Sequence, residues 1–118
     1  MVPRRLLAVG IGLAAVLFAR PTQAEILIAT ASAMTGPSAW FGEQYQRAAE
    51  LAVADLNAKS GVLGQNVELI LGDDFCDPDQ AVALARKLIS DGVVFVAGHL
   101  CSHSSIAATK VYEEARVL

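Results

Sequence analysis

The apolar residues of positions 25–118 follow two periods that alternate along the chain. Short apolar runs at residues 25–31, 67–71 and 93–97 contain β-branched residues and are bounded by turn residues. This pattern is typical of strands that are buried on both faces of a sheet. The apolar residues Val117 and Leu118 predict the start of a fourth strand.

Between these runs, apolar residues recur at the spacing of a helix, which predicts helices at about residues 43–58, 78–90 and 104–114. Asp77 followed by Pro78 is a typical helix start, with Asp77 as N-cap and Pro78 at the first helical position. The faces expected to point inward are, in chain order, Tyr45, Ala48, Ala49, Ala52, Val53 and Leu56; Ala81, Val82, Ala85, Leu88 and Ile89; and Ile106, Ala107, Val111 and Ala115.

The order βαβαβα predicts an α/β fold with a parallel sheet, because helical crossovers of this length join parallel strands. We expect the strand at 25–31 to lie between those at 67–71 and 93–97, with a fourth strand outside the last of these. Ligands of such sheets bind beyond the carboxyl ends of the strands, where the strand order reverses. The loops at residues 32–42 and 100–105 border that point.

The loop at residues 100–105 is rich in hydroxyl groups and leads into a helix. A helix N-terminus after a strand presents free backbone N–H groups, which favour a carboxylate or a phosphate. A plain helix cap made by one of the serines is an equally good interpretation, and the sequence leaves both open. The hydroxyl-bearing residues are Ser102, Ser104 and Ser105.

Trp40 and Phe41 are the one pair of adjacent aromatic residues in the chain. In a loop at the edge of the sheet they would form a wall for an apolar ligand. Packing onto the following helix explains them equally well.

Other chemistries lack their sequence signals. The aspartates at the end of the second strand do not have the spacing of a calcium loop, and His99 and His103 have no third ligand nearby. No Ser-His-Asp set and no phosphate-binding glycine motif can be assigned. We therefore expect no metal, no cofactor and no enzymatic activity. The aspartates concerned are Asp73, Asp74, Asp77 and Asp79.

Residues 1–24 have the pattern of a cleaved signal peptide. Arg4 and Arg5 precede an uncharged apolar run at residues 6–19, and small residues at 22–24 suit cleavage after Ala24. The run of about 14 residues is short for a bilayer span. Without the three arginines of this segment the net charge changes from −3 to −6, and no basic cluster is left, so nucleic acid and anionic membranes are not expected partners.

The two cysteines, Cys76 and Cys101, both follow the signal peptide. In an exported chain they predict a disulfide, with two buried free thiols as the alternative. Closing a loop of this length stabilises a protein by about 3–4 kcal/mol on the chain-entropy account.

Four segments resemble the branched-chain amino-acid-binding proteins, the periplasmic leucine/isoleucine/valine receptors of ABC importers. They are residues 33–37 (AMTGP), 54–59 (ADLNAK), 73–83 (DDFCDPDQAVA) and 98–102 (GHLCS). The resemblance covers residues 25–118 and implies part of the N-terminal lobe of a type I periplasmic binding protein, a fold whose two lobes close on a hinge around the ligand.

The resemblance also implies roles for individual residues. Cys76 and Cys101 match the disulfide pair of the family, and Ser102 matches the serine that holds the α-carboxylate of the ligand. Leu100 and Cys101 match residues that line the ligand's side chain, and Phe41 matches an aromatic residue at the edge of the pocket. Two departures stand out. Phe41 lacks the hydroxyl of the tyrosine found in some relatives, and His103 replaces a small hydroxyl residue.

From this resemblance we expect a monomeric periplasmic component of an ABC importer that binds leucine, isoleucine or valine without catalysis and delivers it to a membrane permease. The second lobe would follow Leu118, so the resemblance implies a truncated frame or the N-terminal piece of a longer protein. The alternatives are a related receptor for amides, urea or other small solutes, and a small exported hydrolase with a flavodoxin-like sheet.

Overall fold

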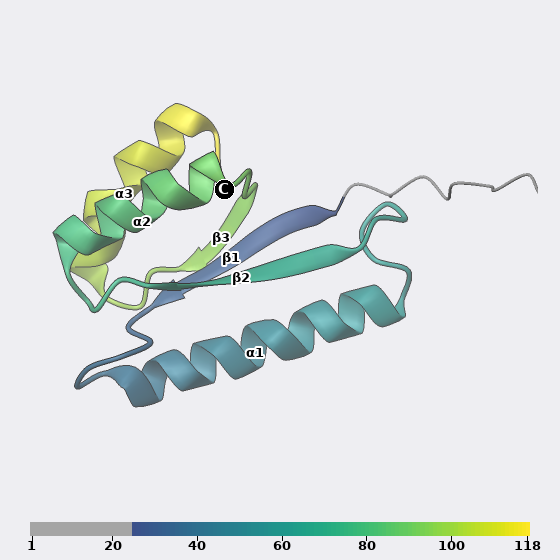
Figure 1. Cartoon of the computed structure of the whole chain (residues 1–118), viewed down its shortest axis with the longest axis horizontal. Coiled ribbons are helices and arrows are strands. Elements are labelled where there is room, and N and C mark those ends of the chain that lie inside the picture. Colours follow the sequence, from purple (N-terminus) through teal and green to yellow (C-terminus); the bar gives the residue numbers. More distant parts are fainter. Residues whose placement is uncertain (1–24) are drawn as a thin grey trace, which may run out of the picture.

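The computed structural model describes residues 25–118, and the predicted signal peptide lies outside the described residues (Figure 1). Three strands alternate with three helices, as the hydrophobic pattern predicts. The elements are β1 (Ile26–Ser32), α1 (Ala39–Ala58), β2 (Val67–Asp73), α2 (Pro78–Ser90), β3 (Phe95–Gly98) and α3 (Ser102–Ala115). None of these helices is long and apolar enough to cross a membrane.

The strands form a parallel sheet in the order β2-β1-β3, which confirms the predicted topology. Ile26 pairs with Val67 at one end of the β1–β2 ladder, and Ser32 pairs with Asp73 at the other. The chain after α3 returns along β3, because Leu118 donates to the Val94 carbonyl at 3.3 Å and accepts from the Val96 N–H at 2.6 Å. This pairing agrees with a fourth strand beginning at Val117–Leu118.

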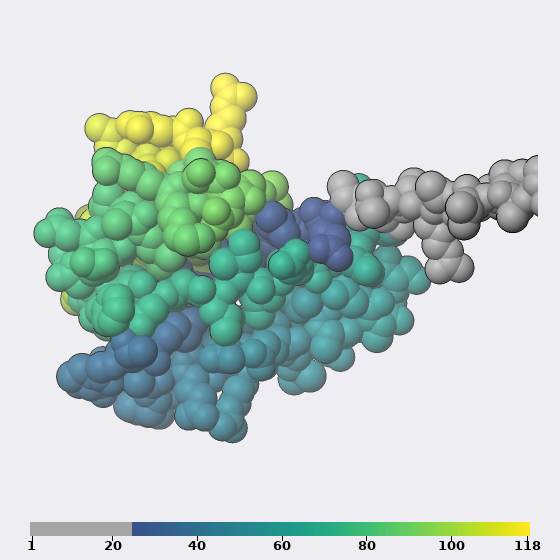
Figure 2. Space-filling model, in the orientation of Figure 1, coloured from purple at the N-terminus to yellow at the C-terminus, as the bar shows by residue number. Residues whose placement is uncertain are grey.

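The helices cover opposite faces of the sheet. α1 lies on one face, and α2 and α3 lie side by side on the other (Figure 1). In the space-filling view the surface of β2 lies between these two layers (Figure 2). The fold therefore has three layers, with the sheet in the middle.

The core is concentrated between the sheet and the α2–α3 layer. One buried cluster joins the sheet to α2 through Ala29, Leu88 and Val93. Complete burial of a leucine such as Leu88 contributes about 1.5–3 kcal/mol. A second cluster joins α2 to α3 through Ala81, Ala85 and Ala108, whose small side chains let the two helices approach closely. The inward face predicted for α2 is thus confirmed at Ala81, Ala85 and Leu88.

α1 begins at Ala39, four residues before the predicted start, so Trp40 and Phe41 belong to its first turn and not to a loop. The expected apolar stripe is only partly correct, because Tyr45 is 37% and Leu56 is 38% exposed. Gly42 is the residue of α1 that is buried. A Cβ on Gly42 would lie 2.2 Å from the Ala33 carbonyl oxygen, so the missing side chain lets α1 pack against the chain after β1.

α3 begins at Ser102, two residues before the predicted start, and its inward face also differs from the prediction. Ile106 is 77% exposed, and Ala115 is also exposed. The buried positions are Ser104 and Ala108, and the small side chain of Ala108 packs against Ala81 and Ala85 of α2. Val111 and Tyr112 pack against the same cluster, so the inward face predicted for α3 is confirmed at Val111.

Candidate functional site

The candidate site lies at the carboxyl-terminal edge of the sheet, where the loops after β1, β2 and β3 come together (Figure 1). The Asp74 N–H donates to the Ser32 carbonyl at 3.0 Å, and the Thr30 hydroxyl donates to the Ala97 carbonyl at 2.9 Å. Gly98 has φ +152°, and a Cβ there would lie 2.2 Å from the Ala31 carbonyl oxygen. Glycine therefore lets the end of β3 lie directly against β1.

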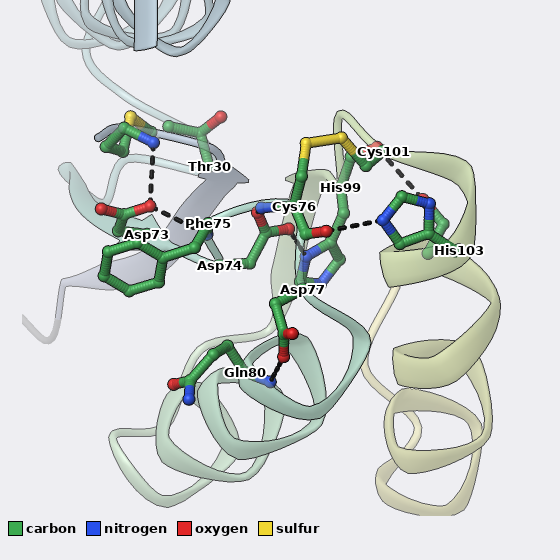
Figure 3. A network of polar contacts seen from close by, with 12 residues as sticks. Thr30, Asp73, Asp74, Phe75, Cys76, Asp77, Gln80, His99, Cys101 and His103 are labelled. Carbon is green, nitrogen blue, oxygen red and sulfur yellow. Dashed lines mark hydrogen bonds and ion pairs between the residues drawn. A yellow bond between two sulfur atoms is a disulfide. The ribbon is translucent and has the colours of Figure 1, made fainter. Parts of the chain in front are cut away.

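A disulfide joins Cys76, in the loop after β2, to Cys101, in the loop after β3 (Figure 3). Since β2 and β3 flank β1, their ends are separated by two strand spacings, or about 10 Å. The two loops lean over the end of β1 and bring the Cα atoms of the cysteines to 5.4 Å. The predicted disulfide pairing is confirmed.

Below the disulfide, three buried or half-buried polar side chains form a chain of hydrogen bonds (Figure 3 shows Asp74 and His99). The Asp74 Oδ2 atom lies 2.5 Å from His99 Nδ1, and the two side chains are 0% and 1% exposed. The opposite ring nitrogen, His99 Nε2, lies 3.1 Å from the Tyr112 hydroxyl. Burial and the nearby Asp74 carboxylate raise the pKa of Tyr112 to about 12, which keeps its proton on the phenol.

Further hydrogen bonds hold the two loops that the disulfide joins. The Asp74 Oδ1 atom accepts from the Cys76 N–H at 2.9 Å, next to the bond from Oδ2 to His99. The Ser105 hydroxyl donates to the His99 carbonyl at 3.1 Å. Asp74 therefore connects the loop after β2 with the loop after β3 independently of the disulfide.

Asp73 connects a different pair of loops. Its Oδ1 atom accepts from the Met34 N–H at 2.9 Å, and its Oδ2 atom accepts from the Thr35 hydroxyl at 2.6 Å. Oδ1 also accepts from the Phe75 N–H at 3.0 Å, which supports a residue with φ +54°. Asp73 thus fixes the loop after β1, which leads into the turn of α1 that carries Phe41.

The remaining aspartates of the acidic stretch do not gather into a metal site. Asp77 caps α2 by accepting from the Gln80 N–H at 2.8 Å, as predicted. Within residues 25–118 no group of three or more His, Cys, Asp or Glu side chains is placed to hold a metal ion.

The N-terminus of α3, at this edge of the sheet, has no side-chain cap. Cys101 is the N-cap residue and its side chain makes no capping hydrogen bond. The first helical bond runs from the Ser105 N–H to the Cys101 carbonyl at 3.0 Å, so the amides of the preceding turn are left over. Ser102 is exposed, whereas the Ser104 hydroxyl is buried without a hydrogen-bond partner. No serine caps the helix, which removes the simpler of the two sequence-based interpretations.

His103 lies in the same turn, at a position where the resemblance leads one to expect a small hydroxyl residue. Its Nε2 atom lies 2.6 Å from the Cys76 carbonyl oxygen (Figure 3). A carbonyl only accepts, so Nε2 carries the proton. His103 adds another bond between α3 and the loop after β2.

The residues predicted to contact a ligand fall into two groups. Leu100, Cys101 and Ser102 are consecutive at the start of α3, and Leu100 and Cys101 are half-buried. Phe41 lies on α1, 42% exposed, with its ring 3.7 Å from that of Trp40. Within residues 25–118 no hydrogen bond or ring contact connects Phe41 with the Leu100–Ser102 group.

Two surface hollows are lined by other residues. One, of about 410 Å³, lies between α1 and the sheet and is lined by Thr30, Gln44, Tyr45, Ala48, Ala49 and Ala97. The other, of about 260 Å³, is lined by residues of β3, α3 and the chain end. Neither includes Phe41 or the start of α3.

Sequence reasoning gave Asp74, His99 and Tyr112 no common role. The available signals were weak: an aspartate directly after a strand, a histidine after the glycine that ends another, and a tyrosine at i+4 and i+8 from Ala108 and Ser104. Only the parallel arrangement of β2 and β3 brings the first two together.

The fold places the chain in the class of open parallel α/β sheets, and proteins of this class bind ligands at the edge where the strand order reverses. A family profile described as "Periplasmic binding protein" matches residues 25–118. The chain belongs to the periplasmic binding protein family.

Individual relatives agree with this assignment. The chain is 47% identical over 94 residues to the Leu/Ile/Val-binding protein of Escherichia coli K12, covering 80% of this chain and 26% of that protein. It is 46% identical over 93 residues to the leucine-, isoleucine-, valine-, threonine- and alanine-binding protein of Pseudomonas aeruginosa PAO1, covering 79% of this chain and 25% of that protein. The chain therefore spans about a quarter of the length of these curated relatives.

Solved structures show the same likeness. A branched-chain amino acid transporter substrate-binding protein from Streptococcus pneumoniae, in complex with isoleucine, matches with a TM-score of 0.74 at 27% identity, covering 78% of this chain and 27% of that one. A type 1 periplasmic binding protein from Bordetella pertussis matches with a TM-score of 0.71 at 36% identity, covering 78% and 25%.

Proposed function

We propose that this chain forms part of the N-terminal lobe of a solute-binding protein that serves an ABC importer for branched-chain amino acids. The observation that carries the proposal is the uncapped N-terminus of α3, with Ser102 exposed beside it, at the point where the strand order reverses. The relatives are named for binding leucine, isoleucine and valine, which supports the choice of ligand.

The α-carboxylate of the amino acid binds at the start of α3. The unpaired amides of the first turn donate to a carboxylate oxygen, and the partial positive charge of the helix end favours the anion. The Ser102 hydroxyl donates a further hydrogen bond. Charge-assisted hydrogen bonds of this kind are stronger than those between neutral groups.

The aliphatic side chain of the ligand contacts Leu100, the Cys101 region and Phe41. Leu100 and Cys101 adjoin Ser102 in sequence, so they lie beside the carboxylate position. The rings of Phe41 and Trp40 lie next to each other, tilted by 32°, and supply an exposed apolar surface at the start of α1. A second lobe that closes over this edge would enclose a ligand that lies between Phe41 and the start of α3.

This binding requires no chemical step, so the proposed protein is a receptor and not an enzyme. Closure of two lobes around a ligand is a common switch between free and loaded states of such receptors. The loaded state is the one proposed to deliver the amino acid to a membrane permease. A single ligand and a single binding edge require no second copy of the chain, and we propose a monomer.

The proposed location is the periplasm, reached through cleavage of residues 1–24. A disulfide that persists in the folded protein suits an oxidising compartment outside the cytoplasm. Mass spectrometry of the protein from a periplasmic extract is expected to find Glu25 as the first residue. A retained Met1 would contradict the cleavage.

Calorimetric titration of the complete gene product with leucine, isoleucine and valine tests the function. We expect heat of binding with at least one of them, and an affinity about 10-fold weaker in Ser102→Ala, which is the common effect of losing one hydrogen bond to a charged group. Ser90→Ala, at the exposed end of α2, is the control and should bind as the unmodified protein does. Heat only with amides or urea would exclude the amino-acid assignment and favour the alternative receptor class.

A further inference from the structure

We propose that Asp74, His99 and Tyr112 are positioning residues, which together set the place of Ser102 and of the first turn of α3. The inference rests on the proposed carboxylate role of Ser102. None of the three side chains needs to touch the ligand, because they act through the backbone of residues 98–102.

The hydrogen bonds of this network have a defined direction. Asp74 is fully buried and acts as an acceptor toward both the Cys76 N–H and His99 Nδ1. His99 Nδ1 therefore carries the proton, and in the neutral ring Nε2 is left as an acceptor. The Tyr112 hydroxyl, 3.1 Å away, donates to it. The chain of donors thus runs from α3 through the loop after β3 to the end of β2.

This chain of bonds constrains the loop that precedes Ser102. His99 is three residues before Ser102, and its backbone carbonyl accepts from the Ser105 hydroxyl at 3.1 Å. Its side chain is held at both ring nitrogens, which fixes the orientation of the ring. The loop after β3 is therefore held in place at two residues. At His99 the side chain and the carbonyl are hydrogen-bonded, and at Cys101 the disulfide is attached.

The same bonds link the proposed ligand-binding turn to the helix that carries it. Tyr112 lies on α3, ten residues after Ser102, where it also packs on the Ala81–Ala85–Ala108 cluster. Asp74 lies at the end of β2, at the edge of the sheet. A shift of α3 along its axis would move Tyr112 away from His99, so the network fixes the distance of the helix N-terminus from the sheet edge.

Nuclear magnetic resonance of the complete gene product, with its disulfide formed, tests this without any ligand. Labelling with ¹⁵N-histidine reports the ring protonation of His99, and His99→Gln assigns the signal. Labelling with carbonyl-¹³C cysteine and ¹⁵N-serine reports the Ser102 amide, because Cys101–Ser102 is the one Cys–Ser step in this sequence. We expect unmodified His99 to be protonated at Nδ1, and Tyr112→Phe and Asp74→Asn each to move the Ser102 amide signal.

Leucine titration of the same variants supplies the second readout. Tyr112→Phe keeps the ring and its packing but removes the donor to His99, and we expect a leucine affinity about 3- to 10-fold weaker. Tyr45→Phe removes the hydroxyl of the other tyrosine, on α1, and should change neither the Ser102 signal nor the affinity. Ser102→Ala should weaken binding while leaving the His99 signals in place.

Two results would overturn the inference. One is a Ser102 amide signal that stays unchanged in both Tyr112→Phe and Asp74→Asn, even if the unfolding temperature falls, since that outcome indicates a purely structural role. The other is an unmodified His99 with its proton on Nε2. If the unmodified protein binds none of the amino acids, the proposed function fails, and the Ser102 signal still decides the positioning role.

Discussion

Asp73 and Asp74 are adjacent in sequence, yet their carboxylates fasten different loops. Asp73 accepts from the Met34 N–H and the Thr35 hydroxyl in the loop after β1, at 2.9 and 2.6 Å. Asp74 accepts from His99 in the loop after β3, at 2.5 Å. Successive residues of a strand point to opposite faces of a sheet, so two neighbouring aspartates can reach the two sides of the site.

The two aspartates are expected to differ in their effect on stability. Asp73→Ala removes partly exposed hydrogen bonds and should lower the free energy of unfolding by about 1–2 kcal/mol. Asp74→Ala leaves the buried His99 Nδ1 and the Cys76 N–H without an acceptor and should lower it by about 2–4 kcal/mol. Urea unfolding of the complete gene product measures both. Equal losses of unfolding free energy in the two variants would contradict the expectation that the buried Asp74 contributes more to stability than Asp73.

Ionisation of Tyr112 is expected to destabilise the fold at high pH. Burial and the Asp74 carboxylate raise its pKa to about 12, above the ordinary value of about 10, so the folded protein holds this proton more tightly than the unfolded chain. The contribution is complete below pH 10 and is lost as the pH rises from 10 to 12. Ultraviolet titration of tyrosinate in a Tyr45→Phe background isolates Tyr112 within this chain.

In the same background, Asp74→Asn should lower the pKa of Tyr112, because it removes the negative charge while burial persists. A midpoint near 10 in the protein with Asp74 intact would contradict the geometry that places Tyr112 beside the Asp74–His99 pair.

The disulfide and the Asp74–His99 contact are expected to compensate for each other. Both join the loop after β2 to the loop after β3. Replacing both cysteines with serine should lower the free energy of unfolding by about 3 kcal/mol. Adding Asp74→Asn should then lower the free energy of unfolding by more than the same change does in the oxidised protein, because the effects of mutations in one shared structural element are not additive.

A thiol assay on the denatured, unreduced chain should find no free cysteine from Cys76 or Cys101.

The piece comprising residues 25–118 alone is expected to bind leucine poorly. Its proposed contacts, Phe41 and Leu100–Ser102, lie on an open edge, and Trp40 is 57% exposed there. A ligand held on one side keeps much of its apolar surface in water and loses the burial that drives binding. Titration of the purified piece should show no micromolar affinity for leucine, and such an affinity would contradict the two-lobed site.

Much of this architecture follows from local patterns in the sequence. The switch between strand and helix periods predicts the element order, and Asp77–Pro78 predicts the start of α2 correctly. The two cysteines predict the disulfide because an exported chain with a single pair has one partner available to each.

The differences have identifiable physical causes. The loop predicted at residues 32–42 is too long, because Pro37 restricts only its own and the preceding residue, and α1 begins at Ala39. The buried face of α3 is made of Ser104 and Ala108, which a search for bulky apolar residues overlooks. Asp74 and His99 are 25 residues apart in sequence, and strand pairing brings them into contact, so no local sequence pattern predicts the contact.

The disulfide also gives the chain a covalent ring that contains all of α2 and β3. The 25-residue separation between Cys76 and Cys101 encloses one complete helix–strand unit. A protease that cuts the backbone once inside this ring therefore produces no separate fragments until the sulfurs are reduced. β3 stays tethered beside β1 after such a nick, and the turn that carries Ser102 keeps its covalent attachment to the rest of the sheet.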